Sequence, residues 1–155
     1  ALAVALGYAA VSAYWAVGGT EPLDTVGGVF ERAGRSGGAA AQVLLWFVVA
    51  AKVVAGFLPL VALRRTPSPV PYRLLWVLAW IEAAILTGYG LVLTATGLLV
   101  QADIIVAGPG ANHRALAWHA YLWDPWFLVW GLLVVVALRW RRPRQGLREG
   151  ASQRS

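Results

Sequence analysis

Apolar residues run along the chain in four long stretches, separated by short segments rich in glycine, proline and charge. The stretches cover residues 1–17, 39–63, 74–100 and 116–140. The second and third are long enough to cross a hydrocarbon core of about 30 Å as tilted helices. The first reaches about 25 Å as a helix, just short of that thickness. We therefore predict an all-α, four-transmembrane-helix bundle, a single domain over residues 1–140, followed by a basic, disordered cytoplasmic tail over residues 141–155.

Two details of this prediction stay open. A signal peptide is the competing interpretation of the first stretch, although no basic residues precede it and Tyr14-Trp15 is a poor end for one. The fourth stretch is interrupted by Asp124-Pro125, which is typical of an N-cap followed by the first helical turn. In that case Asp124 lies at the outer interface and residues 113–123 form a separate short helix. Otherwise the helix continues with a kink at Pro125, and Asp124 points into the bundle.

The composition supports a membrane protein. The chain has 155 residues, of which 59% are hydrophobic and 13% charged, whereas soluble domains are about 45–50% apolar and about 25% charged. There is no cysteine, which excludes disulfides, iron–sulfur clusters and thiolate zinc sites. The net charge is +6. Beside an apolar segment, this basicity indicates anionic lipid headgroups rather than nucleic acid.

The cations also predict the orientation in the membrane. Two regions are strongly basic, the loop over residues 64–73 and the C-terminal segment from Arg139 onward, while the loops over residues 18–38 and 101–113 are mixed or nearly neutral. In a chain with four spans, the two basic regions lie on one side. Cytoplasmic loops carry the excess of Lys and Arg, so we predict that both termini are cytoplasmic.

Three ionisable residues lie inside apolar stretches, Lys52, Glu82 and Asp124, and each costs about 2.5–3.5 kcal/mol there on insertion scales. Of these, Lys52 and Glu82 belong together. Both lie roughly 14–17 Å from the predicted cytoplasmic ends of neighbouring antiparallel helices. We therefore expect an intramembrane ion pair. It could be a structural pair that fixes helix register, or a centre in which Glu82 carries a proton and Lys52 tunes it.

Aromatic residues gather near the predicted outer interface, where they are typical of a membrane-anchoring belt. They could also line an outward-facing pocket for a cation or an amphipathic small molecule, floored by Glu82 and Tyr89. The candidate ligand-binding residues are Lys52, Glu82, Tyr89, Tyr14, Trp15, His119, Trp123, Asp124 and Trp126. A stripe of small residues in the third stretch indicates close helix packing instead; its members are Thr87, Gly90, Thr94 and Gly97.

We expect no metal, no cofactor and no catalytic residue. The two histidines, His113 and His119, are six residues apart and therefore lie on different faces of one helix, which is unsuitable for a haem between them. A zinc site of these histidines with Asp124 has no recognised spacing. His119 is more typical of an interfacial hydrogen-bonding group. No phosphate-binding loop or hydrolase motif occurs in the sequence.

The run Tyr14-Trp15-Ala16-Val17-Gly18-Gly19-Thr20, together with the run from His119 to Trp126 that contains Trp-Asp-Pro-Trp, resembles small four-helix integral membrane proteins of actinobacteria. These form a domain-of-unknown-function family. The resemblance implies a multi-pass protein of the bacterial plasma membrane and implies no activity.

Three functions remain open at this point. The first is small-ligand binding or proton-coupled transport through a Lys52/Glu82 centre, with a homodimer enclosing more volume than one bundle. The second is an accessory or structural subunit that binds a partner membrane protein. The third is a membrane enzyme whose acid–base groups are Glu21, Asp24, His119 and Asp124. Membrane lipids are expected partners in each case.

Overall fold

The computed structural model describes residues 1–21, 25–26, 31–32, 35, 38–64, 69–108 and 111–140. Throughout these residues the regular structure is helical. Its elements are α1 (Leu2–Ala16), α3 (Ala39–Arg64), α4 (Tyr72–Gln101), α5 (His113–Trp118), the π-helical turn η2 (His119–Trp123) and α6 (Asp124–Trp140). The predicted tail over residues 141–155 lies outside the described residues.

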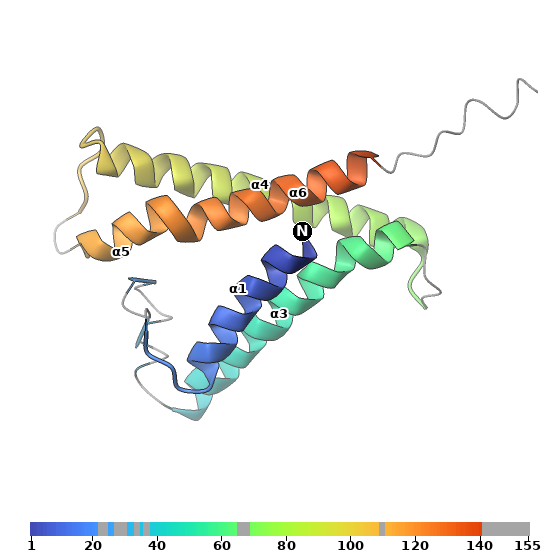
Figure 1. Cartoon of the computed structure of the whole chain (residues 1–155), viewed down its shortest axis with the longest axis horizontal. Helices are drawn as coiled ribbons and strands as arrows, with labels where there is room; N and C mark the ends of the chain where they lie inside the picture. Colours follow the sequence, from blue (N-terminus) through green and yellow to red (C-terminus); the bar gives the residue numbers. More distant parts are fainter. Residues whose placement is uncertain are drawn as a thin grey trace, which may run out of the picture.

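The all-α prediction with four helices is confirmed, since α5, η2 and α6 follow one another as a single long helix (Figure 1). Three helices are long and apolar enough to cross a membrane: Ala39–Arg64, Tyr72–Gln101 and His113–Trp140. The first helix is apolar but has only 15 residues. It begins part-way along the bundle, where Figure 1 marks the N-terminus.

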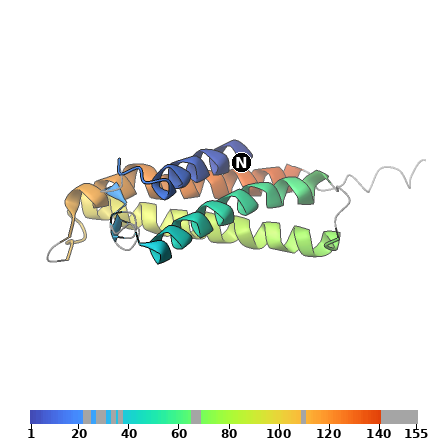
Figure 2. The same cartoon turned by 90° about the horizontal axis from the view of Figure 1, so that it is seen from below.

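The helices are arranged as two pairs. α1 packs along α3, and α4 packs along α6, whereas few contacts join α1 or α3 to α6. We call these pairs the α1/α3 arm and the α4/α6 arm. The arms meet near the end where α3 finishes and α4 starts, and they diverge toward the end that carries α5 (Figure 1). Turned by 90°, all four helices run lengthwise along the molecule (Figure 2).

Small residues permit the close approach within each arm. A Cβ atom on Gly90 would lie 2.7 Å from the Cα of Leu128, and one on Gly97 would lie 2.9 Å from the Cα of Ala120. A Cβ on Gly56 of α3 would likewise lie 2.7 Å from the Cβ of Ala5 in α1. The small-residue stripe of α4 is therefore a packing surface for η2 and α6, in agreement with the close helix packing predicted from the sequence.

Larger side chains fill the space where the two arms meet. Trp130, Val134 and Leu138 on α6 are each at most 1% exposed, and they form one cluster with Ala79 and Ala83 of α4. Ala5 and Ala62 from the other arm belong to the same cluster. This core joins the two arms at the narrow end of the molecule, where they meet. The wide end, which carries α5, is less filled.

The structure decides between the two interpretations of Asp124-Pro125. The helix continues through Asp124, which has α-helical dihedral angles (φ −78°, ψ −42°) and is 4% exposed. The N-cap interpretation, with Asp124 at the interface, is therefore wrong. Proline cannot donate to the preceding turn and its ring crowds that turn's carbonyl group. The chain accommodates Pro125 by widening the turn before it into η2.

Gly90→Ala should destabilise the protein by about 1–3 kcal/mol, because the added methyl group meets the Leu128 backbone, which cannot move aside easily. Thermal unfolding of the purified protein in detergent micelles measures this change. Gly88→Ala is the matched control, since open space surrounds Gly88 on the same helix. It should be neutral or stabilising by up to about 1 kcal/mol. Equal effects of the two substitutions would contradict the close packing described here.

Candidate functional site

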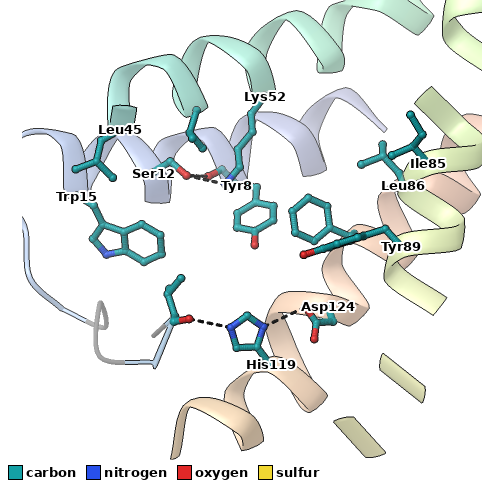
Figure 3. A pocket seen from close by; sticks show the side chains of 13 residues that line it. Tyr8, Ser12, Trp15, Leu45, Lys52, Ile85, Leu86, Tyr89, His119 and Asp124 are labelled. Carbon is teal, nitrogen blue, oxygen red and sulfur yellow. Dashed lines mark hydrogen bonds and ion pairs between the residues drawn. The ribbon is translucent and has the colours of Figure 1, made fainter. Parts of the chain in front are cut away.

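A cavity of about 390 Å³ lies between the two arms, toward the end where they diverge (Figure 3). Both arms contribute to its wall, as does one short piece of the connection between α1 and α3. Its lining residues are Tyr8, Ser12, Trp15, Val26, Leu45, Val48, Lys52, Ile85, Leu86, Tyr89, His119, Asp124 and Phe127. The wall is thus mostly aliphatic and aromatic, with a few polar groups that point inward.

Lys52 reaches from α3 to α1. Its Nζ donates a hydrogen bond to the Ser12 hydroxyl oxygen at 2.7 Å, and it lies 3.5 Å from the centroid of the Tyr8 ring. An ammonium group over an aromatic face is a cation–π contact. The positive charge is therefore held by one hydroxyl group and one ring, both of α1.

The expected ion pair between Lys52 and Glu82 is wrong. Glu82 does not line the cavity, and both of its carboxylate oxygens are buried without a hydrogen-bond partner in the described part of the chain. The two residues do lie at similar depth, but depth does not determine which side of a helix a residue faces. Lys52 faces α1, the helix against which α3 packs most extensively.

Tyr8 is at the centre of an aromatic cluster. Its ring stacks on Trp123 and Trp126 at centroid distances of 5.8 and 5.3 Å, and it lies 4.9 Å from Phe127. The residue is only 6% exposed, yet its hydroxyl group points into the cavity (Figure 3) and forms no hydrogen bond with any described residue. The cavity therefore contains one preorganised hydroxyl group that the protein itself does not use.

His119 links two parts of the wall. Its Nδ1 lies 3.1 Å from Oδ1 of Asp124, and its Nε2 lies 2.9 Å from the carbonyl oxygen of Val26. Residues five apart on a regular α-helix are rotated by about 140° from each other, whereas the i→i+5 geometry of a π turn brings them together. The η2 turn is thus what places His119 against Asp124. The predicted interfacial role of His119 gives way to a role in the wall of the cavity.

These two contacts determine how many hydrogen atoms the His119 ring nitrogens and the Asp124 carboxyl group carry together. The Val26 carbonyl oxygen can only accept, so Nε2 carries a hydrogen. A hydrogen bond between Nδ1 and Asp124 then requires one more hydrogen, either on the imidazole or on the carboxyl group. In both arrangements His119 and Asp124 have a combined charge of zero.

Five of the nine candidate residues predicted from the sequence line this cavity. They are Lys52, Tyr89, Trp15, His119 and Asp124. The other four are placed elsewhere, and Tyr14 in particular is 47% exposed. Trp123 and Trp126 support the cavity from behind the Tyr8 ring: Trp123 donates to the Thr25 hydroxyl oxygen and Trp126 donates to the Val4 carbonyl oxygen. These bonds attach the last helix to α1 and to the connection that follows it.

Sequence reasoning missed Tyr8, Ser12 and Phe127. Tyr8, Ser12 and Trp15 are four and three residues apart, which places them on one face of a helix. That spacing could have identified the polar and aromatic face of α1. No signal in the sequence pairs this face with Lys52, because the contact depends on the rotation of α3.

Acidic residues and histidines do not cluster as a metal site would require. Among the described residues, no group of three or more His, Asp or Glu side chains is close enough together to hold a metal ion. Of the acid–base groups considered for an enzyme, His119 and Asp124 meet, while Asp24 lies outside the described residues. The geometry of the site is thus that of a small apolar chamber with a few fixed polar groups.

A comparison with known protein families identifies the family of this chain. A family model described as "Protein of unknown function (DUF3995)" matches residues 5–134. The chain belongs to the DUF3995 family. Neither the curated proteins nor the solved structures contain a match. Every residue that lines the cavity falls within the matched DUF3995 segment.

Removing either member of the His119–Asp124 pair should destabilise the DUF3995 domain. Asp124→Leu and His119→Leu should each cost about 1–3 kcal/mol, since each removes the hydrogen-bond partner of the other side chain, of which Asp124 is buried and His119 half-buried. The double variant should cost less than the sum of the two, with a coupling of about 0.5–3 kcal/mol. Thermal unfolding in micelles measures all three. His113→Leu, at an exposed position on the same long helix, is the control, and purely additive costs would exclude the pairing.

Proposed function

We propose that this DUF3995 chain is a multi-pass protein of the bacterial plasma membrane that binds a small amphipathic molecule in the cavity between its two arms. The observation that carries the proposal is the cavity itself: a chamber of about 390 Å³ with an apolar and aromatic wall and a few inward polar groups. Ligand sites in proteins are typically apolar chambers of about 300–1,000 Å³ with a small number of polar groups that orient the ligand.

The surface of the long helices supports a location in the membrane. Large apolar side chains stand exposed on them, for example Phe47 and Val54 on α3 at 68% and 67%, and Val92 on α4 at 62%. Exposed apolar surface of this extent is costly in water and is normal for helices that face lipid.

The arginines support the predicted orientation. Arg64 ends α3, Arg73 lies in the first turn of α4 and Arg139 lies in the last turn of α6. These three helix ends lie at the end of the molecule where the arms meet (Figure 1). Because cytoplasmic segments carry an excess of cations, that end faces the cytoplasm. The opposite end of the molecule, where the arms diverge, then faces outward.

Binding within one chain is favoured over a role as an accessory subunit. The small-residue stripe on α4 is occupied within the chain, since Gly90 and Gly97 pack against Leu128 and Ala120. Coupling through a Lys52/Glu82 centre forms no part of the proposal, since Glu82 lies outside the cavity.

A photoactivatable probe tests the proposal. Decan-1-ol that carries a diazirine group should label the protein in lipid nanodiscs saturably, and unlabelled decan-1-ol in excess should suppress this labelling. Mass spectrometry should locate the suppressible label on both arms, at lining residues such as Val48 of α3 and Leu86 of α4. Labelling of lipid-facing residues should not saturate.

Val48→Phe narrows the cavity and should reduce the saturable labelling at least several-fold. Val54→Phe is the matched control, because Val54 lies on the same helix, is 67% exposed and does not line the cavity. It should leave the labelling unchanged. If saturable labelling is absent from the wild-type protein, or if both variants behave alike, the cavity is not a binding site and the proposal fails.

A further inference from the structure

The charges around the cavity do not cancel. Three of its lining residues have side chains that can carry a charge near neutral pH: Lys52, His119 and Asp124. The last two share one hydrogen and have a combined charge of zero, as the two contacts of His119 require. Lys52 is therefore the one charge of the described wall without a counter-charge, because its partners are a hydroxyl group and a ring.

From this imbalance we infer that the ligand is an amphipathic anion, whose acidic head is bound by the Lys52 ammonium group and the Tyr8 hydroxyl group. The inference rests on the proposed function and names the chemical class of the molecule that the cavity takes. An uncompensated charge in an apolar surrounding is costly, and a bound anion removes that cost.

The donors for such a head are in place and unused. An ammonium group has three N–H donors, and within the described residues Lys52 uses one of them, toward Ser12. The Tyr8 hydroxyl group, in a residue that is 6% exposed, has no hydrogen-bond partner among the described residues and points into the cavity (Figure 3). The Lys52 ammonium lies over the Tyr8 ring itself. The wall thus offers two donors from neighbouring helices: the Lys52 ammonium group over the Tyr8 ring, and the Tyr8 hydroxyl group at the edge of that ring.

The remainder of the cavity suits an apolar chain. Leu45 and Val48 of α3 line it from one arm, Ile85 and Leu86 of α4 line it from the other, and Phe127 adds an aromatic surface. At about 30 Å³ for each water-sized unit, a volume of about 390 Å³ holds about a dozen non-hydrogen atoms. A carboxylate with a chain of about ten carbons has this size.

A cationic ligand is a poor fit for the same wall. The acidic group that would bind it, Asp124, is already engaged by His119 at 3.1 Å. An incoming cation would also be repelled by Lys52 without gaining a free carboxylate. A neutral ligand would leave the Lys52 charge as it is and would gain only hydrogen bonds.

Three molecules with the same chain and different heads test the inference. Decanoate, decan-1-ol and decylamine compete with the diazirine probe for the wild-type protein in nanodiscs of zwitterionic lipid, in a buffer in which the decanoate head is ionised. Decanoate should compete at least tenfold more strongly than decan-1-ol, and decylamine should be the weakest. The common chain makes the contribution of burial equal for all three, so the differences report the head group.

Variants of the two donors identify the groups responsible. Lys52→Gln should reduce the apparent affinity for decanoate by about tenfold or more, clearly more than it reduces the affinity for decan-1-ol, while Lys52→Arg should retain most of the preference. Tyr8→Phe keeps the ring under Lys52 and removes only the hydroxyl group, so it should weaken decanoate several-fold. These conservative variants keep the test decisive if Lys52→Gln does not fold.

The composition offers a second readout. Lys52 is the only lysine in the chain, so growth on lysine with ¹³C at Cε gives a single side-chain resonance from this site. Decanoate should shift that resonance saturably, and decylamine should not. The shift does not depend on labelling by the probe.

The outcomes separate the two proposals. Preference for decanoate that is lost in Lys52→Gln and kept in Lys52→Arg supports the anion. Equal competition by all three molecules, with no effect of either donor variant, overturns the anion while the cavity remains a binding site for neutral amphiphiles. Stronger competition by decylamine overturns it as well. Absence of competition by any of them removes the proposed function together with the inference.

Discussion

A single ammonium group inside an apolar bundle constrains much of the structure around it. Burying such a charge is expensive unless nearby groups stabilise it, and α3 places Lys52 against α1. The Ser12 hydroxyl and the Tyr8 ring supply that stabilisation. Tyr8 in turn requires Trp123, Trp126 and Phe127 around its ring. The accommodation of one charge thus joins α3, α1 and α6 around a common space.

The sequence predicts the lengths of the helices well, but it does not predict which side of each helix faces its neighbours. Length and apolarity predicted the ends of α3 and α4 to within two residues, because a helix in lipid must satisfy its own backbone and needs a fixed length. The partner of Lys52 could not be predicted in this way. Depth along an axis follows from counting residues, whereas the rotation of a helix about its axis follows from packing that the count does not contain.

The contact between His119 and Asp124 shows a second limit. The predicted spacing of side chains assumes 3.6 residues per turn throughout a helix. The η2 turn breaks that rule over five residues, and it does so where Pro125 prevents a regular turn. Asp-Pro in an apolar stretch therefore had two meanings, a helix start or an irregular turn. Only the surrounding tertiary structure, in which Asp124 is buried beside His119, distinguishes them.

The division into two arms has a mechanical consequence. Close glycine contacts pack the two helices of each arm against each other, whereas the two arms diverge toward the end that carries α5 (Figure 1). A hinge-like motion that changes the angle between the two arms would leave the packing within each arm intact. Both arms share the wall of the cavity, with Lys52 on one and Leu86 on the other, so a change in this angle would also change the width of the cavity.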